Sequence, residues 1–148
     1  MRFSGQHHFV APTDQVFGAL TDPLQLQQAI DVCERIESKG NDVYEVHTRI
    51  QALGLRVTPV IMVTIADRQP PQSCQFQVTA TSQYGNLGGA IQIRIQPNAS
   101  GSILDYVLEG QISGLLATVA PRLIEVNVQR SLTQFFGKLD RQIAQPAV

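Results

Sequence analysis

Residues 115–143, LLATVAPRLIEVNVQRSLTQFFGKLDRQI, form the longest stretch of helical periodicity in the chain. Such a helix would be about 43 Å long at 1.5 Å per residue, which exceeds the thickness of an ordinary domain of this size. We therefore expect it to cross the whole of the structure that it packs against. Its apolar positions recur every three or four residues and predict one buried stripe: Leu116, Val119, Leu123, Val126, Leu132, Phe135, Phe136, Leu139 and Ile143.

One residue interrupts this pattern. Pro121 lies inside the helical segment, and a proline removes one backbone donor and crowds the preceding turn. We expect Pro121 either to kink the helix or to mark the point where it truly begins.

The segments before the helix alternate apolar and polar residues with a period of two, which is typical of strands with one buried face. Strands are expected at residues 32–38, 43–52, 55–66, 73–81, 90–96 and 102–112. Residues 84–89, which contain Gly85, Gly88 and Gly89, are expected to form a loop. The strand 55–66 is apolar on both faces, and Pro59 within it indicates a sheet edge or a bulge.

The first thirty residues add another strand and two short helices. Residues 3–9 form the strand, and Thr13 or Asp14 can cap the helix that follows. Asp22-Pro23 ends that helix and begins a second one at residues 24–30, because proline suits a first helical position. Strands that are segregated from helices indicate an α+β fold. We expect a curved antiparallel β-sheet wrapped around the long C-terminal helix, with two short helices between strands 1 and 2.

Composition narrows the classes of partner. The net charge is −1, the pI is near 6.3, and the 11 Lys and Arg residues are scattered, so the chain lacks the basic face that nucleic acid requires. No apolar run approaches the roughly 18 residues of a membrane span, and residues 1–5 do not resemble a signal peptide. We expect a single domain, residues 1–148, in the cytoplasm, with Cys33 and Cys74 as reduced thiols.

Short matches along nearly the whole chain resemble one family. They are Phe3-Ser4-Gly5, Val10-Ala11-Pro12, Val16-Phe17, Leu20, Asp22-Pro23, Ile30, Cys33-Glu34, Gly54, Pro70-Pro71, Gly101, Tyr106, Leu116, Arg122-Leu123-Ile124, Phe135-Phe136 and Leu139. This pattern is similar to that of the carbon monoxide dehydrogenase G subunit (CoxG) family of the SRPBCC, or START-like, superfamily. The resemblance implies a helix-grip (START/Bet v 1-like) fold. It also implies an accessory role beside a molybdenum hydroxylase such as carbon monoxide dehydrogenase, with at most peripheral membrane contact.

No group of residues predicts a catalytic or metal site. His7 and His8 are adjacent on a strand and point to opposite faces, and His47 lies on a different strand, so we expect surface histidines. Asp105 and Glu109 share a strand face, but that face is opposite the apolar one and is expected to be solvated. Cys33 has no neighbouring base to activate it and is expected to be a small buried apolar residue. We expect no cofactor.

The expected function is the binding of an apolar small molecule, such as a lipid or quinone, in a cavity between the sheet and the C-terminal helix. The residues expected to line that cavity are Phe17, Met62, Tyr106, Leu108, Leu116, Leu123 and Phe135. One alternative is an enzyme of the polyketide cyclase or aromatase type, for which Tyr106, Thr58 and Thr64 are the polar groups expected to face inward. Another is a filled, ligand-free interaction module that recruits a partner redox enzyme.

Overall fold

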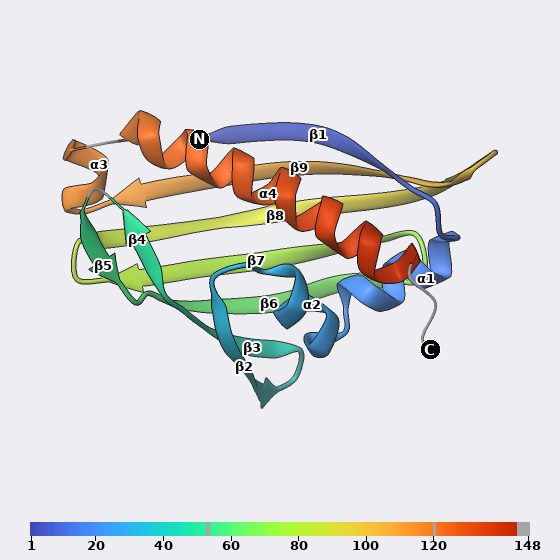
Figure 1. The fold of residues 1–148 in the computed structure, drawn as a ribbon, viewed down its shortest axis with the longest axis horizontal. Helices are drawn as coiled ribbons and strands as arrows, with labels where there is room; N and C mark the ends of the chain where they lie inside the picture. Colours follow the sequence, from blue (N-terminus) through green and yellow to red (C-terminus); the bar gives the residue numbers. More distant parts are fainter. Residues whose placement is uncertain (53, 120, 145–148) are drawn as a thin grey trace.

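The computed structural model describes residues 1–52, 54–119 and 121–144. A seven-stranded antiparallel sheet curves behind one long helix (Figure 1). Its strand order is β1-β9-β8-β7-β6-β3-β2, and the short strands β4 and β5 pair separately. The strands are β1 (Arg2–Phe9), β2 (Cys33–Gly40), β3 (Val43–Thr48), β4 (Ile50–Ala52), β5 (Leu55–Val57), β6 (Val60–Gln69), β7 (Ser73–Ser82), β8 (Gly85–Asn98) and β9 (Gly101–Ser113).

The helices are placed as the sequence predicts. Helices α1 (Thr13–Leu20) and α2 (Pro23–Ala29) lie between β1 and β2, and α3 (Leu115–Val119) and α4 (Pro121–Ala144) follow the last strand. Figure 1 shows α4 running across the inner face of the sheet, with its C-terminal end beside α1 and α2. The α+β helix-grip architecture is therefore confirmed.

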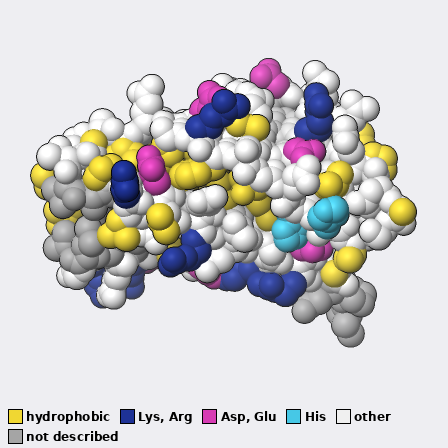
Figure 2. All heavy atoms as spheres, turned by 90° about the horizontal axis from the view of Figure 1, so that it is seen from above, with side chains coloured by type: hydrophobic (Ala, Val, Ile, Leu, Met, Phe, Trp, Pro, Cys, Tyr) yellow, Lys and Arg dark blue, Asp and Glu magenta, His cyan; other side chains and the backbone are white. Residues whose placement is uncertain are grey.

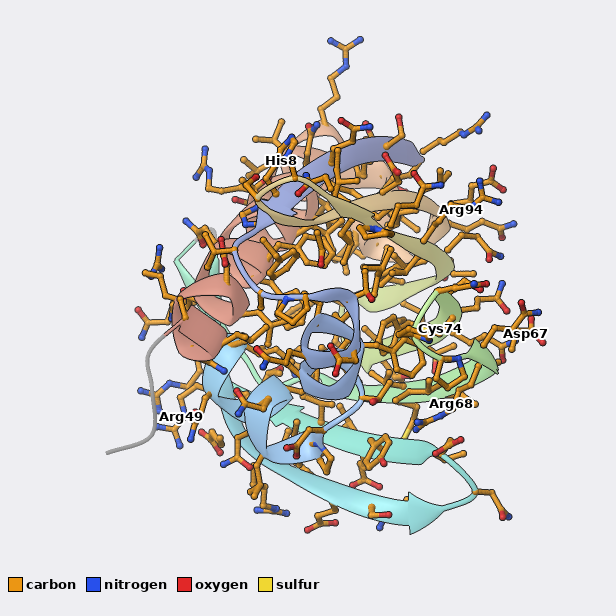
Figure 3. All side chains as sticks on the ribbon, turned by 90° about the vertical axis from the view of Figure 1, so that its right-hand side faces the viewer. His8, Arg49, Asp67, Arg68, Cys74 and Arg94 are labelled. Atoms are coloured by element: carbon orange, nitrogen blue, oxygen red, sulfur yellow. The ribbon has the colours of Figure 1, made fainter. Side chains whose placement is uncertain are left out.

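The core lies between the inner face of the sheet and the C-terminal half of α4. Phe136 and Leu139 of α4 are 2% and 0% exposed, and they pack with residues of α1 and of the central strands. Gln142 of α4 donates from Nε2 to Oε1 of Gln25, at 2.7 Å, and thereby ties α4 to α2. Figure 3 shows Cys74 pointing into this layer, whereas His8 and Arg94 lie on the outside.

The region around Pro59 differs from the prediction. Residues 55–66 do not form one strand, because the chain leaves β5 at Val57 and enters the main sheet as β6 at Val60. Pro59 is buried at this break, and its carbonyl accepts a hydrogen bond from Thr48 Oγ1 at 2.9 Å. Pro59 thus ends one pairing and begins another, since a proline cannot donate to a ladder.

The glycine-rich segment also differs, because it opens strand β8 and is not a loop. Gly85 has a φ of +138°, and a Cβ there would lie 2.3 Å from the Ser113 carbonyl oxygen. Only a residue without a side chain can therefore pair this closely with the end of β9. Gly85 follows the turn at residues 83–84 and pairs with Ser82, so the turn is shorter than the predicted loop and the other glycines belong to the strand.

The structure corrects the predicted cap of α1 and shows where α4 begins. Pro12 occupies the N-cap of α1 and no side chain caps that helix, so the predicted caps Thr13 and Asp14 are wrong. Asp22 caps α2 instead, accepting from the Leu24 amide at 3.0 Å. Helix α4 begins at Pro121, which confirms the second of the two expectations for that residue.

Candidate functional site

The inner face of the sheet is closed at the α1 end and more open at the α3 end. Near α1, one cross-strand row consists of Cys74, Ile93 and Tyr106, which are 2%, 4% and 7% exposed. Towards α3, the matching row is only half-buried and consists of Ile61, Ala80, Leu87 and Ile112. Both rows are apolar, so they differ in how far they are shielded from solvent and not in the polarity of their side chains.

Two facing glycines separate these rows. Gly89 and Gly110 are paired across β8 and β9, and they lie on the inner face next to Val78. A Cβ on Gly89 would meet the Glu109 carbonyl oxygen at 2.5 Å, so the strands approach too closely here for any side chain. The glycines themselves leave this part of the inner face bare, and the Met1 side chain lies over Gly110, with its Cε 2.9 Å from the position that a Cβ would take.

Helix α4 shows the same gradient along its length. None of residues 121–130 is buried, and Leu123 and Val126 are 44% and 50% exposed. Ile124 and Val128, on the turns that lead to Leu132, are half-buried. Figure 2 shows hydrophobic side chains gathered on the surface over the half of the molecule that carries α3 and the start of α4.

Most of the predicted ligand residues lie on the inner side. Phe17, Tyr106 and Leu108 are buried, and Leu116 and Phe135 are half-buried. The Tyr106 and Phe136 ring centroids are 5.1 Å apart, and those of Phe135 and Phe136 are 5.2 Å apart, so Tyr106 and Phe135 belong to one aromatic cluster. Leu116 is held in place because its amide donates to the Tyr84 carbonyl at 2.9 Å.

Met62 and Leu123 do not lie where they were expected. Met62 pairs with Glu45 and Thr79 on the outer face of the sheet, because the inward positions of β6 are Ile61, Val63 and Ile65. The strand is apolar on both faces, and the alternation therefore did not reveal which face is inward. Leu123 is largely exposed on α4.

Fewer polar groups face the interior than the three that the sequence predicts. Thr64 shares the outer face with Met62, and Thr58 is exposed between β5 and β6. Of the three polar candidates only Tyr106 faces the interior.

His7 was expected at the surface but faces α4. Its Nε2 lies 3.2 Å from Asp140 Oδ2, and its ring makes an edge contact with Phe9 at 4.7 Å between centroids. The strand alternation contains the signal, since His7 shares its face with Phe3, Gly5 and Phe9. His8, on the other face, is exposed as expected.

The carboxylates agree with the expectations, whereas Cys33, which was expected to be buried, is only half-buried. Asp105 and Glu109 lie on the outer face, where Asp105 accepts from Gln6 at 2.6 Å and Glu109 pairs with Arg2 at 3.4 Å. Burial raises the pKa of the Cys33 thiol, and it raises the pKa of Cys74 to about 11. Both thiols are therefore protonated and poorly nucleophilic at neutral pH.

The outer face has features that the sequence did not reveal. An open hollow of about 890 Å³ crosses β7, β8 and β9, with Thr79, Thr81, Glu109 and Gln111 around the small residues of β8. Its lining also includes Met1 and the inner-face residues Ala80 and Leu87, and no residue of α4 lines it. Also on the outer face, Glu37, Glu45 and His47 bring one donor atom each within 4.8 Å of one another.

No helix among residues 1–52, 54–119 and 121–144 is both long and apolar enough to cross a bilayer.

Comparisons with solved structures establish the fold. A conserved protein from Geobacillus kaustophilus superposes with a TM-score of 0.90 at 21% identity, covering 97% of this chain and 95% of that one. Ara h 8.0201 superposes with a TM-score of 0.73 at 11% identity, covering 97% of each chain. The protein TTHA0849 from Thermus thermophilus gives 0.69 at 12% identity, again covering 97% of each. Identities this low support the fold alone.

Comparisons by sequence give the family. No curated protein matches the chain. The family model for the carbon monoxide dehydrogenase G subunit (CoxG) matches residues 5–144, which is nearly the full length of the chain. The motifs around Gly5, Pro12, Asp22-Pro23, Tyr106 and Phe135-Phe136 all lie within that match. This chain belongs to the CoxG family.

Proposed function

We propose that this chain binds one apolar small molecule, of the lipid or quinone kind, between the inner face of the sheet and the first half of α4. The observation that supports the proposal most is the burial gradient. The same apolar face of the sheet is closed beneath Phe136 and Leu139 but only half-buried towards α3, the end at which α4 begins with no buried residue among residues 121–130. Half-buried apolar surface facing an exposed helical segment is what an apolar ligand would cover.

The chemistry of the proposed site suits a ligand with little polarity. Val78, Leu87, Ile112 and the glycine pair would form the floor, and Leu116 would close the α3 end. Covering apolar surface is worth about 25 cal/mol per Å², so a chain or ring system of a few hundred Å² gains enough to offset its lost freedom. The Tyr106 hydroxyl is the polar group that could orient a carbonyl or headgroup at the inner end.

The expected lining changes in two places. Met62 is left out because its strand position faces outward, and Phe17 belongs to the closed α1 end. Leu108, Leu116 and Phe135 stay in the proposed site, Tyr106 would border it from the closed row, and Leu123 would lie at its rim.

Native mass spectrometry of the purified protein, beside an organic extract of the same sample, tests this proposal. A bound species of a few hundred daltons that extracts into solvent supports it. Ala80→Trp should abolish uptake, because the indole would fill the open end from the inner face. Thr79→Trp is the matched control, since the neighbouring position on β7 faces outward and uptake should persist.

Membership of the CoxG family supports a further part of the proposal, namely that the chain assists a molybdenum hydroxylase such as carbon monoxide dehydrogenase. A protein that holds an apolar electron carrier could exchange it with such a redox enzyme. Oxidation of the enzyme's substrate with a water-insoluble quinone should then be faster in the presence of the wild-type chain, and not in the presence of Ala80→Trp.

A second function, a ligand-free interaction module, is favoured by one observation. Leu115, Leu123 and Val126 are 57%, 44% and 50% exposed, and they lie close together in sequence at the α3–α4 end. A partner could cover them directly. In that case the purified protein has a clean apo mass and takes up no lipid or quinone, and Leu123→Asp weakens partner binding while Ala80→Trp does not.

A further inference from the structure

The outer face of the β2–β3 hairpin carries a cluster of donor atoms that the proposed function does not use. Glu37 and Glu45 are direct cross-strand partners, and His47 follows on the same face two residues after Glu45. Two carboxylates directly opposite each other repel, so this pairing requires a positive charge nearby. Lys39 supplies one in this structure, but its Nζ is 3.4 Å from Glu37 Oε2 and 3.4 Å from Glu45 Oε2. Charge-assisted N–H···O bonds are usually about 2.7–2.9 Å long, so both contacts are loose.

His47 provides an independent observation. Its Nε2 is shielded from solvent and has no hydrogen-bond partner among the described residues. Glu45 Oε1 is only 2.7 Å from that nitrogen and Glu37 Oε2 is 3.8 Å away, but neither approach has hydrogen-bond geometry. Nε2 and the two carboxylate oxygens thus converge on one small region of the outer face, where a shared cation would contact all three.

We infer that Glu37, Glu45 and His47 form a binding site for a divalent transition-metal ion such as Zn²⁺. Ligands that bind zinc with bonds of 2.0–2.2 Å lie about 2.8–3.6 Å apart, which is close to the two spacings around His47 Nε2. One imidazole and two carboxylates are a donor set that suits zinc, and water would complete the coordination. The other oxygen of Glu37, Oε1, accepts from Arg35 at 2.9 Å, which leaves Oε2 facing the site.

Lys39 is the natural competitor of such an ion. Its side chain is 45% exposed, so it can move into solvent when a cation takes its place between the two carboxylates. The ion would replace the two loose contacts of Lys39 with Glu37 and Glu45, while the Arg35 hydrogen bond to Glu37 Oε1 would remain. The bound ion would join β2, the edge strand, to β3. The site is on the opposite side of the sheet from α4 and is independent of the proposed ligand site.

Isothermal titration of the untagged, chelator-treated full chain with ZnCl₂ tests the inference. Wild type should take up one equivalent. His47→Gln and Glu45→Gln should each weaken binding by about tenfold or more, since even groups behind the ligands are worth about 10–100-fold. Lys39→Met should bind several-fold more tightly because the competing charge is gone.

Two control variants exclude other donors. His8→Gln removes an exposed histidine and Cys33→Ser a half-buried thiol, and both should bind Zn²⁺ as wild type does. The His47 imidazole NMR signals should shift on addition of Zn²⁺ while those of His8 stay unchanged. The inference is overturned if wild type takes up no Zn²⁺, if His8→Gln or Cys33→Ser loses as much as His47→Gln, or if Lys39→Met fails to tighten binding. Circular dichroism in chelator verifies that each variant is folded.

Discussion

At the scale of single residues, Gly5 and Tyr106 explain each other. They are cross-strand partners on β1 and β9, and the Tyr106 ring folds over the glycine so that a Cβ there would lie 2.7 Å from the hydroxyl oxygen. An aromatic ring that covers an edge-strand glycine stabilises the strand pairing. The Phe3-Ser4-Gly5 motif and the tyrosine, which the sequence presents a hundred residues apart, are therefore one structural unit.

Gly5→Ala should destabilise the protein by about 1–3 kcal/mol, because the buried ring would have to shift within a packed core. Gly18→Ala is the matched control, since Gly18 is an exposed residue of α1 and a Cβ added there would have nothing within 4 Å. That change should stabilise the protein by about 1 kcal/mol through helix propensity. Urea unfolding measures both values, and equal effects of the two substitutions would contradict the packing argument.

The Cys74 thiol should make stability depend on alkaline pH. Its pKa is raised from 9.0 to about 11 because burial disfavours the thiolate. The folded state therefore holds the proton more tightly than the unfolded state does, so this contribution is complete below pH 9 and is lost as the pH rises towards 11. A shift of that size corresponds to about 3 kcal/mol.

Cys74→Ala removes this dependence. The difference in the free energy of unfolding between wild type and Cys74→Ala, measured by chemical denaturation, should shrink from pH 8 to pH 11. A constant difference across that range would show that the thiol does not titrate on unfolding as described.

At the scale of elements, the starts of α1 and α2 are stabilised differently. Asp22 accepts from the Leu24 amide at 3.0 Å, whereas α1 begins after Pro12 with no capping side chain. Asp22→Ala should therefore cost about 0.5–2 kcal/mol, the usual value of an N-cap. Thr13→Ala should cost much less, although the sequence makes Thr13 a plausible cap. Thermal melts of the two variants decide between these assignments, and similar losses would mean that Thr13 contributes a cap in solution.

At this scale the sequence correctly predicts the buried face of each strand and helix whose apolar residues recur with a clear period. Alternation places Tyr106, Leu108 and Ile93 on the buried face, and helical spacing identifies Phe136 and Leu139. The errors occur where a residue type has two uses. Pro59 lies in the break between two pairings, Gly85 is the first paired residue of β8 and not part of a loop, and Met62 lies in a strand that is apolar on both faces.

The candidate site was only partly predictable, because local sequence patterns encode the faces of strands but not the distances between elements. Its floor follows from strand alternation, but its open end depends on how far α4 stands from the sheet, which no local pattern records. The Glu37–Glu45–His47 cluster depends on the register between β2 and β3. The turn at residues 39–42 suggests that hairpin but does not set its register, because β2 carries two irregularities.

At the scale of the whole molecule, the protein consists of a closed half and an open half joined by one helix. The closed half is cross-linked by α4 contacts to α1, α2 and β1, including Gln142 with Gln25 and His7 with Asp140. The open half has half-buried apolar rows and a helical segment with no buried side chain. Stability should be distributed accordingly, since regions with few buried apolar contacts open at lower free energy.

Hydrogen–deuterium exchange measures this distribution directly. In the ligand-free protein, amides in residues 122–130 should exchange faster than those in residues 132–142 of the same helix. Adding the extracted ligand should slow exchange in the first segment, because the ligand would supply the missing apolar contacts, and it should leave the second segment nearly unchanged. Ala80→Trp should slow the first segment without any ligand, since the indole occupies the same space, whereas Thr79→Trp should not. Equal exchange along α4, or ligand protection confined to the outer face of the sheet, would contradict both the gradient and the proposed site.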